Sequence, residues 1–114
     1  MEIKLSKNSE DVYLLELTGN LDLSSSDLLK NYVMGKLKTG LECLILSFKN
    51  VVEINSAGIG ALINVSSTLR KLNCTLIMLT PEGPVLEALE ISRIRNYFIV
   101  AHTLQEALHK ANKK

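Results

Sequence analysis

The chain has 114 residues, 46% of them hydrophobic, which predicts one domain over residues 1–114 with one core. Its 13 Lys and Arg residues balance 12 Asp and Glu residues, so we expect no basic stripe and no direct nucleic-acid binding. No apolar run is long enough to span a bilayer, and the start, Met-Glu-Ile-Lys, lacks the pattern of a signal peptide, so we expect a cytoplasmic protein.

Two cysteines, Cys43 and Cys74, each stand at the start of an apolar run and belong to no CxxC motif or Cys/His cluster. We therefore expect buried structural thiols, with no metal site and no cofactor.

The first part of the chain predicts a β-hairpin. Residues 1–6 alternate between apolar and polar side chains, which is the period of a half-buried strand. A polar turn at 7–11 leads to a second apolar run at 12–17, and so short a link favours antiparallel pairing. We expect the segment at 18–22, with the sequence TGNLD, to end the second strand.

A first helix is predicted next. Ser24, followed by Asp27 three residues later, has the spacing of a capping box, and Gly40 stands where a C-terminal cap is expected. The apolar residues at helical spacing are Leu28, Leu29, Tyr32, Val33 and Leu37.

The centre of the chain predicts a strand, a short polar link and a helix. The run at 42–48 is almost continuously apolar, which is typical of a strand buried on both faces. Ser56 lies at the expected first turn of a helix, and an amphipathic segment follows from Ile59 to Leu72. The next apolar run, at 75–79, then predicts a parallel strand after a right-handed crossover. The apolar side of the helix comprises Leu62, Val65, Leu69 and Leu72.

The last third predicts two more helices and one strand. Pro84 suits the first turn of a short helix, and the expected apolar side of this helix comprises Val85, Leu86, Leu89 and Ile91. A strand is expected at 97–100, and Thr103 with Glu106 forms a capping box that opens a final helix through Ala111. The trailing lysines Lys110, Lys113 and Lys114 are interpreted as a solvated tail. The whole order predicts an α/β fold with a mixed five-stranded sheet and about four helices, an antiparallel hairpin followed by βα units.

Two short motifs carry a family resemblance. The segment Asn55-Ser56-Ala57-Gly58-Ile59-Gly60 resembles the Asp-Ser-(Ser/Thr/Ala)-Gly-(Leu/Ile)-Gly signature of the STAS domain, named for sulphate transporters and anti-sigma-factor antagonists. The segment at 17–22 is similar to the Leu-x-Gly-(Glu/Asp)-(Leu/Ile)-Asp turn of the same family. The order of elements from Val12 to Leu108 also fits a STAS domain.

The resemblance implies a regulatory binding protein and not an enzyme. In stand-alone family members the signature serine, here Ser56, is phosphorylated by a partner that is both a serine kinase and an anti-sigma factor. The unphosphorylated protein binds this kinase and frees the sigma factor, and a PP2C-type phosphatase acts on the phosphorylated form. The family's turn aspartate corresponds to Asp22. The implied partner-binding residues are Asp22, Asn55, Ser56, Ala57, Gly58 and Ile59.

One departure from the signature motivates an alternative function. Asn55 stands where the family usually has an acid, and Asn20 replaces another, so this corner carries less negative charge. The alternative is a non-switching STAS subunit that serves as a structural or accessory partner in a signalling or lipid-transport complex.

A phosphoryl group on Ser56 would add roughly −1.5 to −2 charges, and we expect a helix N-terminus, with the amides of Ala57 and Gly58, to accept it without unfolding. The switch would therefore change the surface. A hundredfold loss of partner affinity needs only about 2.7 kcal/mol, which a partly buried charge next to Asp22 supplies.

Several residues also have simpler interpretations. Ser56 is alternatively an ordinary N-cap, and Asn55 a residue that holds the loop through its side chain. Gly58 and Gly60 are explained equally well by close packing of a helix on the sheet. A nucleotide-binding enzyme that uses Gly58 to Gly60 as a phosphate cradle is a weaker alternative, because the chain lacks a Walker lysine and a complete GxGxxG motif.

Overall fold

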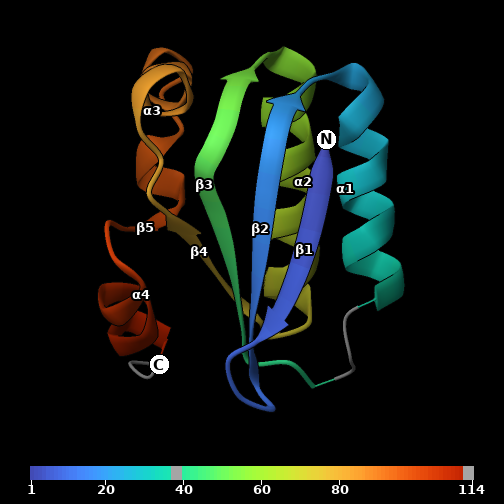
Figure 1. Cartoon of the computed structure of the whole chain (residues 1–114), viewed down its shortest axis with the longest axis vertical. Helices are drawn as coiled ribbons and strands as arrows, with labels where there is room; N and C mark the ends of the chain where they lie inside the picture. Colours follow the sequence, from blue (N-terminus) through green and yellow to red (C-terminus); the bar gives the residue numbers. More distant parts are fainter. Residues whose placement is uncertain (37–39, 112–114) are drawn as a thin grey trace.

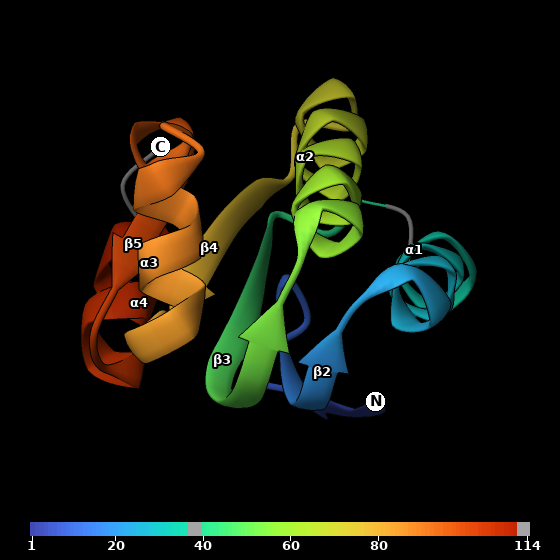
Figure 2. The same ribbon diagram turned by 90° about the horizontal axis from the view of Figure 1, so that it is seen from above.

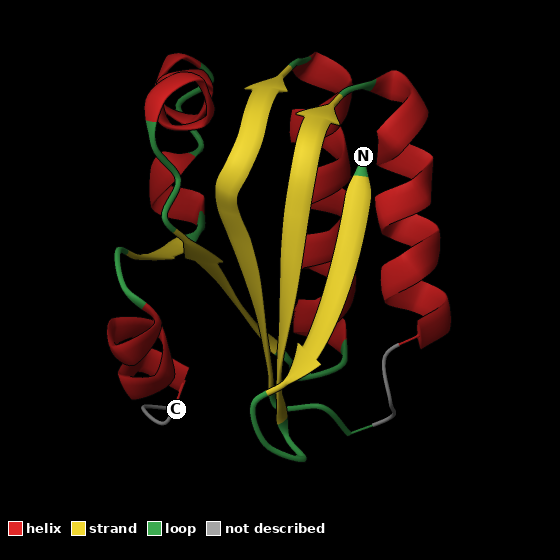
Figure 3. Cartoon of the chain, in the orientation of Figure 1, coloured by secondary structure: helices red, strands yellow, loops and turns green. Residues whose placement is uncertain are grey.

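The computed structural model describes residues 1–36 and 40–111, and its centre is one five-stranded sheet with the strand order β1-β2-β3-β4-β5. The first two strands form an antiparallel hairpin and all later pairings are parallel, as Figures 1 and 3 show. This arrangement confirms the predicted mixed sheet. The strands are β1 (Glu2–Lys7), β2 (Val12–Leu21), β3 (Cys43–Ile54), β4 (Thr75–Leu79) and β5 (Ile99–Ala101).

The helices cover both faces of the sheet. Seen from above, α1 and α2 lie side by side along one side of β2 and β3 (Figure 2). The larger core joins this face to α1, α2 and α3, and a smaller core joins the opposite face to α4. The helices are α1 (Leu23–Lys36), α2 (Ser56–Lys71), α3 (Gly83–Ile91) and α4 (Leu104–Ala111), with a short 3-10 helix at Arg95–Tyr97.

The apolar start of β3 belongs to both cores. Leu44 and Leu46 pack in the larger core, whereas Cys43 and Ile45 pack in the smaller one, and all four side chains are fully buried. Because successive strand residues point to opposite faces, a continuous apolar run requires two covered faces. The predicted burial of this strand on both faces is therefore confirmed, and Cys74 is buried as well.

The central strands are longer than predicted. The expectation that residues 18–22 end β2 is wrong, because pairing with β3 continues to Leu21, opposite Ile54. Two irregularities in the register, after Glu16 and after Gly19, absorb extra residues of β3. Gly19 adopts a φ of 109°, which residues with a side chain rarely accept. Both strands thus extend to one edge of the sheet, where the chain enters α1 and α2.

The apolar stripes of the helices are narrower than their spacing indicated. Leu28, Leu72 and Ile91 were expected on buried sides but are exposed, Leu72 by 65% and Ile91 by 74%. Leu72 and Ile91 stand at the C-terminal ends of their helices, where the chain turns away from the sheet. The predicted position of Leu37 lies outside the described residues.

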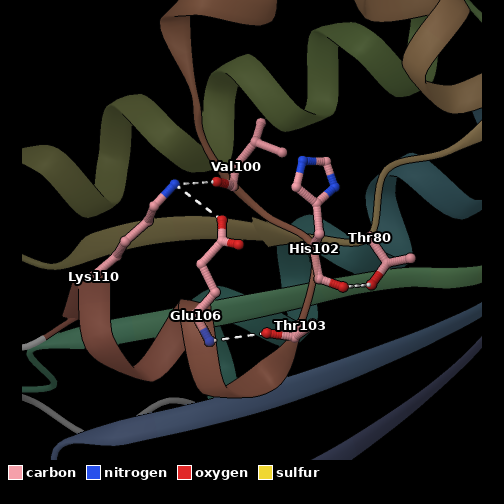
Figure 4. A network of polar contacts seen from close by, with 6 residues as sticks. All are labelled: Thr80, Val100, His102, Thr103, Glu106 and Lys110. Carbon is pink, nitrogen blue, oxygen red and sulfur yellow. Dashed lines mark hydrogen bonds and ion pairs between the residues drawn. The ribbon is translucent and has the colours of Figure 1, made fainter.

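The C-terminal helix is attached to the edge strand by polar contacts, shown in Figure 4. The Thr103 hydroxyl accepts a hydrogen bond from the Glu106 amide at 3.0 Å, which confirms the predicted cap. Lys110 donates to the Val100 carbonyl at 2.6 Å and pairs with the Glu106 carboxylate at 3.3 Å, so its interpretation as part of a solvated tail is wrong. Lys113 and Lys114 lie outside the described residues.

The last strand begins later than predicted. Tyr97 lies in the 3-10 helix instead of the strand and is 40% exposed, and β5 starts at Ile99.

Candidate partner-binding site

The two motifs meet where β2 and β3 end, at the top of the molecule in Figure 1. Leu21 and Ile54 are paired in the sheet, and the Asn55 amide donates to the Leu21 carbonyl at 3.2 Å. The residues that follow these strands, Asp22 and Asn55, therefore begin neighbouring turns. Parallel strands place their carboxyl ends at one edge, which is where α/β proteins commonly bind ligands.

Asp22 organises the first of these turns. Its Oδ1 accepts hydrogen bonds from the Ser25 amide at 3.2 Å and from the Ser24 hydroxyl at 2.8 Å. The Asp22 amide in turn donates to Ser25 Oγ at 2.8 Å, so the two residues form a reciprocal capping box. Asp22 caps α1, and the prediction that Ser24 does so is wrong.

Asp22 carries a negative charge at neutral pH. The hydrogen bond from the Ser24 hydroxyl, followed by the bond from the Ser25 amide, holds the pKa of this carboxyl below its ordinary value. Ser25 and Ser26 are buried beneath the turn, where Ser25 Oγ donates to the Asn20 carbonyl at 2.7 Å. The carboxylate is therefore held in a fixed position by its own turn.

Asn55 organises the second turn. Its Oδ1 accepts a hydrogen bond from the Gly58 amide at 3.1 Å, and Asn55 is the N-cap of α2. This confirms that Asn55 holds the loop, whereas the interpretation of Ser56 as the N-cap is wrong. Ser56 is the first residue of α2 and is exposed.

Gly58 lets α2 approach the ends of the strands. A Cβ at this position would lie 2.3 Å from the Leu21 carbonyl oxygen and 2.9 Å from the Ile54 side chain, so only glycine fits. Gly58 is buried, and close packing on the sheet explains it. A Cβ at Gly60 would meet nothing within 4 Å, so packing does not explain that glycine.

The amides at the start of α2 have different roles. The Gly58 amide is bound by Asn55, so the expectation that it is free to accept a phosphate is wrong. The amides of Ser56 and Ala57 belong to the first turn, whose N–H groups have no partner within the helix. Ala57 and Ile59 are half-buried beside them.

A cleft of about 440 Å³ opens next to these turns, between the ends of β2 and β3 and the helix α3. Three of its residues carry a carboxylate: Asp22, Glu53 and Glu87. The motifs identified Asp22 and Asn55 but missed Glu53, Glu87 and the exposed Ile91, because nothing in the local sequence places α3 beside β3. The residues that line the cleft are Asn20, Leu21, Asp22, Glu53, Ile54, Asn55, Pro84, Glu87, Ala88 and Ile91.

The described residues contain neither a cluster of metal-binding side chains nor a membrane-spanning helix. Within residues 1–36 and 40–111, no group of three or more His, Cys, Asp and Glu side chains is placed to hold a metal ion. In the same part of the chain, no helix combines the length and apolar character needed to cross a membrane.

Comparison with known proteins identifies the family. The family model of the STAS domain matches residues 4–109. The chain therefore belongs to the STAS domain family, as the two motifs indicated. A search of curated protein sequences found no match to the chain.

Solved structures show the same fold at low sequence identity. TM1081 of Thermotoga maritima superimposes with a TM-score of 0.87 at 19% identity, over 96% of this chain and 93% of that protein. The unphosphorylated anti-sigma factor antagonist SpoIIAA of Bacillus gives 0.80 at 18% identity, over 99% and 98%. The murine anion transporter Slc26a9 gives 0.81 at 16% identity, over 96% of this chain but 19% of the transporter.

Proposed function

We propose that this STAS protein is an anti-sigma-factor antagonist that works by partner switching. In the unmodified state it binds an anti-sigma-factor serine kinase, which then releases its sigma factor. Phosphorylation of Ser56 weakens that complex, and a PP2C-type phosphatase restores it. The observation that carries the proposal is that Ser56 is an exposed residue and the first residue of α2, beside the turn of Asp22.

The position of the N-cap supports a switch that acts on the surface. Because Asn55 and not Ser56 caps α2, the Ser56 hydroxyl can be modified while the bond from the Gly58 amide to Asn55 stays in place. The N-terminus of a helix also favours negative charge. Phosphorylation is therefore expected to leave the helix folded.

The charges around Ser56 support a large effect on binding. A phosphoryl group would add roughly −1.5 to −2 charges to an edge that already carries Asp22 and Glu53. A partner that covers this edge would then have to desolvate the new charge. A hundredfold loss of affinity corresponds to about 2.7 kcal/mol, and leaving one buried charge without a partner commonly costs that much.

The structural neighbours support the same class of function. SpoIIAA is described as an anti-sigma factor antagonist in an unphosphorylated form, with a TM-score of 0.80, and its phosphorylated form gives 0.73. The fold of this chain thus resembles a protein that exists in both states.

The direct test is phosphorylation by the cognate anti-sigma-factor kinase with Mg-ATP, mapped by mass spectrometry. We expect one phosphate, at Ser56, in the wild type and in a Ser67→Ala control on the same helix, and none in Ser56→Ala. Ser56→Asp should bind the kinase at least about tenfold more weakly than the wild type. If Ser56→Ala and Ser56→Asp both bind as the wild type does, the protein is instead a non-switching STAS subunit, consistent with the missing acid at position 55.

A further inference from the structure

The cleft beside α3 exists because β3 is longer than its neighbour β4. Pairing between these strands ends at Ser47 and Leu79, whereas β3 continues to Ile54. In the described residues no strand pairs with β3 on this side beyond Ser47, and α3 occupies the place where β4 would have continued. A helix does not pair with the edge of β3 as another strand would, so an open cleft of about 440 Å³ remains between β3 and α3.

The charged residues of the cleft all have the same sign. Asp22, Glu53 and Glu87 contribute carboxylates, and no Lys, Arg or His belongs to the lining. Within the described part of the chain, none of these three carboxylates forms an ion pair. The whole chain has almost equal numbers of acidic and basic residues, so this concentration of negative charge is local.

Apolar side chains lie directly beside the carboxylates. Leu21 is buried at the base of the cleft and Ile54 is half-buried, whereas Ile91 at the end of α3 is 74% exposed. Ile91 therefore offers an apolar contact beside the carboxylates of the cleft.

We infer that this cleft docks a segment of a partner protein that carries lysine or arginine next to an apolar side chain. The cation meets the carboxylates of Glu53, Glu87 and Asp22, and the apolar side chain covers Ile91. The Asp22 carboxylate is ionised at neutral pH and adds to the same negative potential. Opposite charges on the two surfaces raise the association rate and select against acidic partners.

This inference goes beyond the phosphorylation switch because Glu53, Glu87 and Ile91 lie outside both STAS motifs. The cleft lies beside Ser56, so a partner seated on the motif surface could extend a basic segment into it. Binding in the cleft does not itself depend on phosphorylation, and it can be tested on the unmodified protein without a kinase.

The test uses a defined probe, the peptide acetyl-Leu-Arg-Leu-Arg-Leu-Arg-amide, titrated into the ¹⁵N-labelled full chain at low ionic strength. We expect saturable shifts of backbone amides at Asn20, Glu53, Glu87 and Ile91. The same peptide with glutamate in place of arginine should cause no saturable shifts. Added salt should weaken binding, because exposed charges are screened.

Matched variants assign the binding to the cleft. The double variant Glu53→Gln/Glu87→Gln should raise the Kd at least about tenfold, whereas Glu90→Gln, on the same helix but outside the cleft, should change it by less than about twofold. Glu53, Glu87 and Glu90 are all exposed, and unchanged amide shifts away from the cleft will show that the variants fold. The inference is overturned if the basic peptide does not bind, if its shifts lie elsewhere, or if the double variant binds it as tightly as the wild type does.

Discussion

Gly58 and Gly60 have opposite environments on the same helix, and replacing each by alanine should change stability in opposite directions. A methyl group on Gly58 would lie 2.3 Å from the Leu21 carbonyl oxygen, whereas ordinary contact begins near 3.4 Å, so α2 must move by roughly 1 Å. That movement strains the bond from the Asn55 amide to the Leu21 carbonyl, which is already 3.2 Å long.

The expected magnitude for Gly58→Ala follows from three effects. Overpacking typically costs about 1–3 kcal/mol, and weakening one hydrogen bond costs about 1 kcal/mol. The better helix propensity of alanine returns up to about 1 kcal/mol. The net loss in the free energy of unfolding is therefore about 1–3 kcal/mol. Gly60→Ala meets no atom within 4 Å and should gain about 0.5–1 kcal/mol.

Urea denaturation followed by circular dichroism measures both variants against the wild type. Equal slopes with shifted midpoints would show that only stability has changed. A Gly58→Ala variant as stable as the wild type would contradict this prediction, and so would two substitutions that change stability in the same direction.

Substitutions at three further residues test other contacts by the same denaturation assay. Asn55→Ala should lower the free energy of unfolding by about 0.5–2 kcal/mol, and Asn55→Asp should lower it much less, because asparagine and aspartate are both good N-caps. An equal loss of stability in the two variants would exclude the capping role. Asp22 has a lowered pKa, so its stabilisation is complete above the ordinary aspartate value of about 3.9 and fades as the pH falls through the lower native value. Asp22→Asn should therefore differ from the wild type at pH 7 and converge with it in strong acid, and a pH-independent difference would contradict this. Lys110→Met should cost about 1 kcal/mol by removing the donor to the Val100 carbonyl, and an unchanged midpoint would show that this contact adds nothing.

Sequence patterns predicted the elements of the fold more reliably than their ends. The apolar run of β3 and the periodicity of α2 are local signals, and both elements were found where expected. The end of β2 was missed because Thr18, Gly19 and Asn20 have the composition of a turn, yet their backbones pair with β3. Pairing with a neighbouring strand overrides the local preference of these residues for a turn. The sequence of one segment does not show which strand will lie beside it.

At the candidate site too, local motifs were predicted, whereas features that depend on distant segments were not. The motifs located Ser56 and Asp22, but the residues that cap the two helices were misassigned, because a cap depends on where the preceding strand stops. Glu53 and Glu87 come from distant segments that only the crossover to α3 brings together. The rule that parallel strands end at one edge was the single signal that could have grouped β2 and β3, and it does not place α3.

We propose that a charge placed on Ser56 controls partner binding while the fold stays intact. The most direct measurement is calorimetric titration of the cognate anti-sigma-factor kinase with the phosphorylated and unphosphorylated protein, together with an amide spectrum of each form. We predict an affinity at least about a hundredfold lower for the phosphorylated form, with spectral changes confined to the turns at Asp22 and Asn55 and the start of α2. Equal affinities of the two forms, or spectral changes throughout α2, would exclude a switch that acts on the surface.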